Sequence, residues 1–179
     1  EAFGNWGAAA HGATFSPKQN YDITKKKNMR DAEANSNGVV NLKSEMNYAH
    51  AYYAAGFDKG GNTSYYNTIT TAFIDGRQVI ADANGEKLTN AKRREVKRHA
   101  RTICSNWEKV IAEVVFKYAG SVYSNIKAAK ATTGGNMWQV NGSTEQAEHD
   151  AYLVFTVFRT DSIWFHIILF TALLYLSSG

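Results

Sequence analysis

The histidines and the single cysteine are the side chains of this sequence best suited to bind a metal or to act as a nucleophile. The five histidines show no H-x-x-x-H or H-E-x-x-H spacing, and one cysteine cannot complete a zinc site with them through a local motif. Cys104 has His99 and Arg101 nearby, but it lies beside an apolar stripe, where we expect a small packed residue. The sequence therefore predicts no metal site, no nucleophilic cysteine and, with one cysteine, no internal disulfide.

Motifs that bind phosphates or support acyl transfer are absent from the sequence. It has no G-x-x-x-x-G-K-[ST] loop, no G-x-G-x-x-G that opens a helix and no G-x-S-x-G elbow. We therefore expect a protein that is not an enzyme and binds no cofactor.

The densest basic stretch runs from Lys92 to Arg101 in a chain of formal net charge +4. On an amphipathic helix such a stretch would bind lipid headgroups or an acidic partner, or it would simply be solvated. It lacks the interleaved aromatic residues of a stacking platform, so nucleic acid is not an expected partner.

Two Asn-x-Ser/Thr triplets begin at Asn62 and Asn141, and both lie in polar stretches that contain glycine. A glycan attached there would reach solvent, so both are candidate glycosylation sites. In a chain this rich in asparagine, such triplets also arise by accident.

A long amphipathic helix is predicted to begin near Thr89 or Asn90 and to reach the break at residues 132–135, with Gly120 as a kink or end. Apolar residues recur there in alternating steps of three and four: Val96, Ala100, Ile103, Trp107, Val110, Val114 and Tyr118. The opposite side carries Lys and Arg, followed by Glu, which is typical of a solvated face.

Upstream, a second helix is predicted over residues 41–55, with Asn41 as its N-cap and Gly56 just past its end. Residues 64–83 are rich in Tyr, Ile and Thr around Asp75-Gly76, which predicts a small β-hairpin with a tight turn. Residues 1–38 are predicted to be loop with a little helix, and their spaced aromatic residues should pack on a neighbouring element.

The C-terminal part of the sequence changes character twice. Residues 132–150 are predicted to be a polar linker, and residues 151–179 a membrane-associated segment. Residues 163–176 are almost entirely apolar, but a membrane span needs about 20 residues, so we expect the helix to continue beyond Gly179. Trp164 and His166 near the start of this run are candidate membrane-interface residues.

Other interpretations of the C-terminal part remain open. Residues 163–176 would also suit a buried core helix, and residues 152–158, rich in Val and aromatic residues, would suit a β-strand donated to a neighbouring subunit. The first residue is Glu1 and not Met, as expected of a processed or fragmentary chain.

Taken together, these patterns predict a mainly α fold with a small β-hairpin (α+β), a long amphipathic helix and a C-terminal transmembrane helix. Residues 1–131 would form a luminal or extracellular helical domain, joined by the linker to the membrane segment.

Residues 163–170, Ile-Trp-Phe-His-Ile-Ile-Leu-Phe, resemble the start of the membrane helix of the prorenin receptor family, accessory subunits of the V-type proton-pumping ATPase. The resemblance covers under a tenth of the chain. In that family a processed luminal domain precedes one C-terminal membrane helix, which packs in the membrane sector of the pump. The resemblance thus implies a single-pass membrane protein that accompanies proton transport, and the triplets at Asn62 and Asn141 would make it a glycoprotein.

The function that we expect is that of a non-enzymatic accessory or assembly subunit of a membrane protein complex, with the lipid bilayer and other subunits as partners. The alternative is a surface or filament-forming structural protein, whose C-terminal apolar segment completes a neighbouring subunit.

Overall fold

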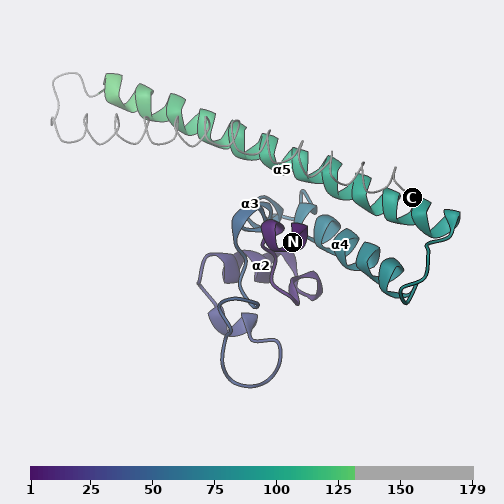
Figure 1. Cartoon of the computed structure of the whole chain (residues 1–179). Helices are drawn as coiled ribbons and strands as arrows, with labels where there is room; N and C mark the ends of the chain where they lie inside the picture. The colour runs from purple at the N-terminus through teal and green to yellow at the C-terminus, as the bar shows by residue number, and fades with distance from the viewer. Residues whose placement is uncertain (132–179) are drawn as a thin grey trace. The chain divides into compact units, whose positions relative to one another are not determined.

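The structure is a computed structural model, and it describes residues 1–131, with the side chains of residues 1–128. This part of the chain is mainly helical and contains no β-strand, so the predicted mainly α fold is confirmed and the β-hairpin is not. The helices are α1 (Ala2–Trp6), η1 (Gly12–Thr14), α2 (Pro17–Thr24), η2 (Met29–Ala32), α3 (Ala49–Asp58), α4 (Tyr65–Ala81) and α5 (Asn90–Ala131) (Figure 1). Contacts group the chain into two units, residues 1–110 and the residues from Ile111 onward, which are described separately below.

The N-terminal segment packs through its aromatic residues, as the sequence predicts. Trp6 is fully buried, and its indole Nε1 donates a hydrogen bond of 3.0 Å to the hydroxyl of Thr70 in α4. The ring of Phe3 meets that of Phe73 edge-on at 5.6 Å between centroids. Helix α1 is only five residues long, too short to be stable through its own hydrogen bonds, so these tertiary contacts stabilise it.

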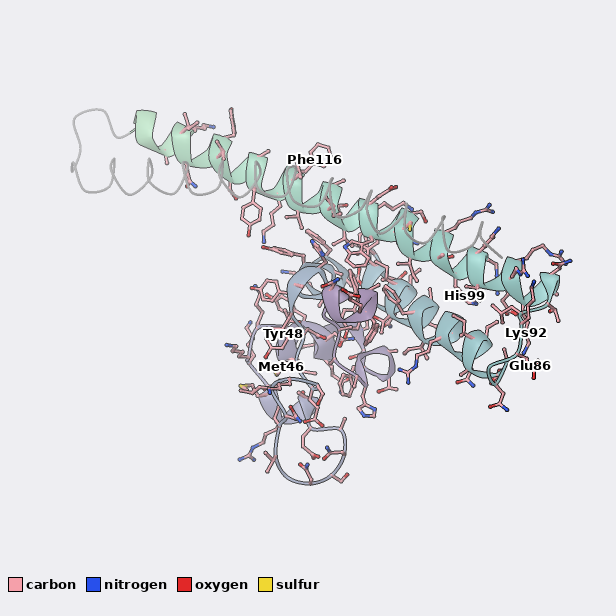
Figure 2. All side chains as sticks on the ribbon, viewed as in Figure 1. Met46, Tyr48, Glu86, Lys92, His99 and Phe116 are labelled. Carbon is pink, nitrogen blue, oxygen red and sulfur yellow. The ribbon has the colours of Figure 1, made fainter. Side chains whose placement is uncertain are left out.

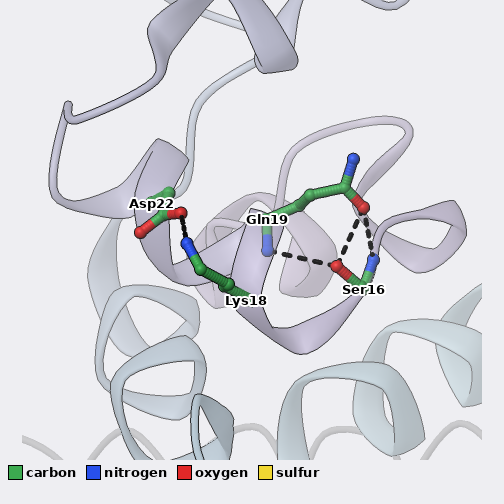
Figure 3. A network of polar contacts seen from close by, with 4 residues as sticks. All are labelled: Ser16, Lys18, Gln19 and Asp22. Carbon is green, nitrogen blue, oxygen red and sulfur yellow. Dashed lines mark hydrogen bonds and ion pairs between the residues drawn. The ribbon is translucent and has the colours of Figure 1, made fainter.

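Helix α2 begins with a complete capping box. Ser16 and Gln19 exchange side-chain to backbone hydrogen bonds of 3.0 and 3.3 Å, and Pro17 occupies the first helical position (Figure 3). In the same turn the side chain of Lys18 forms an ion pair with that of Asp22. The capping-box hydrogen bonds satisfy backbone donors that the start of a helix leaves unpaired. A serine followed by Pro, with Gln three residues after the serine, is a known signal for the start of a helix. The sequence of residues 1–38, which predicts mostly loop, therefore contains a local signal for α2.

The predicted helix over residues 41–55 is correct only in its second half, because α3 starts at Ala49 and includes Gly56. Tertiary contacts hold the chain extended immediately before it. The backbone N–H of Tyr48 donates to Gly7 at 2.7 Å, and the Asn47 side chain accepts the N–H of Ala9 at 2.9 Å. An extended segment pinned to the N-terminal segment cannot also be helical, so Asn41 is not an N-cap.

Within residues 64–83, Tyr65–Ala81 form helix α4, which overturns the predicted hairpin. The buried positions include Tyr66, Ile69 and Gly76, which recur at helical spacing, so one face of α4 enters the core. Gly76 is not a turn residue: a Cβ placed on it would lie 3.3 Å from the Cβ of His99 in α5, so the glycine permits a close approach of two helices. Burial of this face outweighs the local β preference of Thr and Ile.

Asp58, the last residue of α3, caps the start of α4. Its carboxylate oxygens accept hydrogen bonds from the backbone N–H groups of Tyr65 at 3.0 Å and Tyr66 at 2.7 Å, and from the Thr63 hydroxyl at 2.6 Å. Ser64, the formal N-cap residue, makes no capping bond with its side chain. A buried carboxylate at a helix N-terminus is favourable, because the helix dipole is positive there. Asp58 thus links the end of α3 to the start of α4 and sets where α4 begins.

The core of residues 1–110 has two parts: a hydrophobic cluster of Ile23, Ala32 and Met46, and a cluster of aromatic rings around Trp107 of α5. The indole of Trp107 lies 5.2 Å from that of Trp6, 6.2 Å from the ring of Phe73 and 5.3 Å from that of His50, measured between centroids. His50 is accordingly a packing residue. These contacts join α1, α3, α4 and the first turns of α5 in one core.

The long amphipathic helix predicted from Asn90 is confirmed as α5, and it runs through Gly120 without ending there. The predicted linker, the candidate glycosylation site at Asn141 and the predicted transmembrane helix lie outside the described residues. Within residues 1–131, no helix combines the length and the apolar composition that a membrane span requires.

Candidate interaction surface

Four cationic side chains form a ridge along the outer side of the first turns of α5. They are the exposed residues Arg94, Lys97, Arg98 and Arg101, hereafter the basic ridge. Their spacing of i, i+3, i+4 and i+7 places them within about 100° of the helix circumference, and Arg94 and Arg101 are about 10 Å apart along the axis. The ridge therefore presents one row of charge and not a scattered surface.

Packing of the opposite side of α5 determines which way the ridge faces. Val96, His99 and Ile103 are half-buried, and His99 lies against Gly76 of α4; Figure 2 labels His99 on the side of α5 nearer to that helix. The buried side and the ridge lie on opposite sides of the helix, so packing of the buried side on α4 leaves the ridge exposed to solvent.

The ridge is electrostatically unfavourable within its own chain. Arg94 and Arg98, like Lys97 and Arg101, are like charges four residues apart, and each such pair destabilises a helix by about 0.2–0.5 kcal/mol. The described part of the chain offers one ion pair in return, Arg98 to Glu95 at 3.5 Å, and both side chains are largely exposed. The first turn of α5 contains no acidic residue, although the helix dipole disfavours cations at this end.

Lys25 and Lys59, in contrast to the basic ridge, are stabilised by contacts within residues 1–110. Lys25 follows the last residue of α2 and Lys59 the last residue of α3, and cations at helix C-termini are favourable. Lys25 lies 4.3 Å from the ring centroid of Tyr52 and donates to its hydroxyl, while Lys59 lies 5.0 Å from the ring centroid of Tyr21. Among residues 1–128, whose side chains are described, the basic ridge has no comparable contacts, and for that reason it is the candidate interaction surface.

Cys104 is half-buried on α5, and its environment opposes nucleophilic chemistry. Burial raises the pKa of its thiol, and the nearby carboxylate of Glu108 raises that pKa further. A thiol, unlike a thiolate, is a poor nucleophile and a poor metal ligand. In the described part of the chain, no three His, Cys, Asp or Glu side chains come together as metal ligands would.

Of the candidate sites that the sequence predicts, only Asn62 lies in the described part of the chain. Asn62 is exposed in the connection between α3 and α4, where a glycan would meet solvent. Ser64, the hydroxyl residue of that triplet, is exposed as well. Trp164 and His166, the candidate membrane-interface residues, lie beyond the described residues, as does Asn141.

A buried polar network was not foreseen from the sequence. Asn47 donates to the Thr24 hydroxyl at 3.1 Å and accepts from the Tyr66 hydroxyl at 2.6 Å, and burial raises the pKa of Tyr66 well above its ordinary range. The amide of Asn20 donates to the Gly12 carbonyl at 2.9 Å in the same network. Isolated Asn and Tyr residues in the sequence carry no signal of such partners, which only the fold brings together. The network stabilises the packing of the N-terminal segment.

Comparisons with known proteins add no relatives. No protein-family model, no curated protein and no solved structure matches this chain.

Proposed function

We propose that this protein is a non-enzymatic accessory or assembly subunit of a membrane protein complex, and that the basic ridge binds an acidic surface of a partner subunit. The observation that carries the proposal is the row of four exposed cations at the N-terminal end of α5. Within the described residues, one ion pair, Arg98 to Glu95, offsets this charge. The apolar run at residues 163–176 supports a membrane location.

In this proposal the C-terminal segment and the helical domain bind different partners. The C-terminal segment packs among other membrane helices, and the helical domain on the luminal or extracellular side docks through the ridge. Three of the four ridge residues are arginines, whose planar guanidinium groups bind carboxylates through two parallel hydrogen bonds. A row of such contacts fixes orientation, and its charge accelerates the encounter with an acidic partner.

The resemblance of residues 163–170 to the membrane helix of the prorenin receptor family makes a V-type proton-pumping ATPase the first complex to test as the partner. A role in proton transport would then follow from association with the pump, with no catalytic residue in this chain.

The test compares two variants with the same change in net charge. One carries Arg94→Glu, Lys97→Glu and Arg101→Glu on the ridge; the control carries Lys26→Glu, Lys43→Glu and Lys87→Glu at exposed positions elsewhere. The full chain is extracted from membranes in mild detergent, and its association with larger complexes is measured by native sizing and mass spectrometry.

The wild type and the control should need detergent for extraction and should co-purify with a larger complex. The ridge variant should still need detergent but should lose at least about nine-tenths of the complex, since three contacts of about 0.5–1 kcal/mol each correspond to a tenfold effect or more. A wild type that behaves as a soluble monomer without detergent would overturn the membrane proposal. A ridge variant that keeps its complex would overturn the role of the ridge.

The second candidate is a filament-forming surface protein, favoured by the β-prone composition of residues 152–158. Electron micrographs of the purified chain distinguish the two. Ordered polymers without lipid would support this candidate, and single particles in detergent would exclude it.

A further inference from the structure

The part of α5 that begins at Ile111 carries an apolar stripe on its exposed side. Every member of the stripe is exposed, and the exposed fractions are 74% for Phe116, 69% for Tyr123 and 45% for Ile126. Figure 2 shows the labelled Phe116 projecting from the α5 ribbon. The members are separated by steps of four, three, four and three residues: Ala112, Phe116, Ala119, Tyr123 and Ile126. We call this set the outer stripe.

This spacing is the heptad pattern by which one helix packs against another. Residues at alternating steps of three and four form the a and d positions of a two-helix seam. Over the two heptads from residue 112 to residue 126, an unsupercoiled helix drifts by only about 40° from that repeat, so the stripe stays on one side. Two large aromatic side chains exposed along one seam are characteristic of a helix that has a partner.

Gly120 adds an independent observation. It lies in the interior of α5 and beside the outer stripe, and a Cβ placed on it would have nothing within 4 Å. Glycine lowers helix stability relative to alanine, so its presence there has no explanation in the described part of this chain. A glycine beside an apolar seam permits a second helix to approach closely, as Gly76 does in α4.

We propose that the outer stripe pairs with the outer stripe of a second copy of this chain, with the two α5 helices antiparallel and Gly120 at the twofold axis. In this register Phe116 of one copy packs against Ile126 of the other, and Ala119 packs against Tyr123. Large residues thus meet smaller ones along the seam, and the two glycines face each other at its centre.

Charge decides the direction of the pairing. Glu113 and Lys127 are two heptads apart on the same flank of the outer stripe, next to its two ends. Antiparallel pairing brings Glu113 of each copy opposite Lys127 of the other, which forms two ion pairs, whereas parallel pairing forms neither of them. Flanking charges of this kind determine partner and orientation in coiled coils. This self-association goes beyond the proposed function and does not depend on it.

The test measures the mass of the full chain in detergent by sedimentation equilibrium, because detergent covers the C-terminal apolar residues. The wild type should be a dimer. Phe116→Glu with Tyr123→Glu should be monomeric, with a dissociation constant raised by at least roughly 100-fold. Ser124→Glu, an exposed position of α5 off the stripe, is the control and should remain dimeric. Circular dichroism should be the same for all three, because the altered side chains are exposed.

The direction of pairing is tested by reversing charges. Glu113→Lys and Lys127→Glu should each weaken the dimer several-fold, and the double variant should restore it. A monomeric wild type, as when another segment of the same chain covers the stripe, would overturn the proposal. So would a dimer that survives Phe116→Glu with Tyr123→Glu. Charge effects that merely add in the double variant would overturn the antiparallel register.

Discussion

Tyr66 is the residue that most closely ties the N-terminal segment to α4. Its ring is 2% exposed, and its hydroxyl donates to Asn47 Oδ1 at 2.6 Å. A Cβ on Gly12 would collide with that hydroxyl at 1.8 Å, so the glycine makes room for the tyrosine. Because burial disfavours the charged phenolate, the pKa of Tyr66 lies well above its ordinary range in the folded protein.

Tyr66→Phe should lower the free energy of unfolding by about 1 kcal/mol at neutral pH, since one buried hydrogen bond is lost while Asn47 Oδ1 keeps the N–H of Ala9. The gap between wild type and variant should narrow above about pH 10. There the unfolded wild type releases the tyrosine proton and the folded one retains it, so wild-type stability falls by up to about 1.4 kcal/mol per pH unit. Urea unfolding from pH 8 to pH 11 measures this; a gap that stays constant would contradict it.

Cys104 is a packed residue and not a reactive one. A raised thiol pKa means that the thiolate fraction at neutral pH is small, so the residue behaves as a packed side chain. This agrees with its place beside the apolar side of α5.

At the scale of helices, Asp58 replaces the missing cap of α4. Asp58→Ala should lower the free energy of unfolding by about 2–3 kcal/mol, because two backbone N–H groups and one hydroxyl lose a buried carboxylate. Ser64→Ala is the matched control: it removes the formal N-cap side chain, which makes no capping bond, and should cost less than about 0.5 kcal/mol. Equal effects in urea unfolding would show that Asp58 does not cap α4.

Gly76 and Gly56 form a second matched pair. Both lie inside helices, where alanine normally stabilises by about 0.5–1 kcal/mol. Gly56→Ala should show that gain, because a Cβ there has nothing within 4 Å. Gly76→Ala should be neutral or destabilising, because its Cβ would press on His99 at 3.3 Å and that atom is fixed to the α5 backbone. Thermal melts of the two variants decide; a gain at Gly76 would mean that α4 and α5 do not approach closely there.

At the scale of the whole molecule, the core of residues 1–110 depends on Trp107. Trp107→Ala should lower the free energy of unfolding by about 3–5 kcal/mol, since the ring contacts Trp6, Phe73 and His50. Domains of this size are stable by only about 5–15 kcal/mol, so a large part of the stability would be lost. Ile80→Ala, at a side chain 54% exposed, is the control and should stay near wild type. Urea unfolding curves that coincide for the two variants would show that the aromatic cluster is not the core.

The basic residues of the chain differ in how their charge is stabilised. Lysines at the ends of α2 and α3 are stabilised by helix dipoles and tyrosine rings, whereas the cations of the basic ridge lie beyond the first turn of α5, next to like charges. The proposed partner of the ridge and the proposed second copy at the outer stripe use different turns of the same helix.

The sequence by itself determined α5, because a stripe repeated over many turns outweighs any local ambiguity. It also predicted that the basic stretch of residues 92–101 lies on a helix with an apolar opposite side. The start of α2 can also be predicted from the sequence, because the capping box at Ser16 and Gln19 depends only on neighbouring residues.

Only the tertiary structure decided residues 41–83. Thr and Ile around Asp75-Gly76 favour strands locally, yet the face of α4 that holds Tyr66 and Ile69 is buried as a helix. The start of α3 was set by Asn47 and Tyr48, which bind the N-terminal segment some 40 residues earlier in the chain. Local propensities are worth tenths of a kcal/mol per residue, whereas burial of a large side chain is worth about 1.5–3 kcal/mol, so contacts between distant segments prevailed.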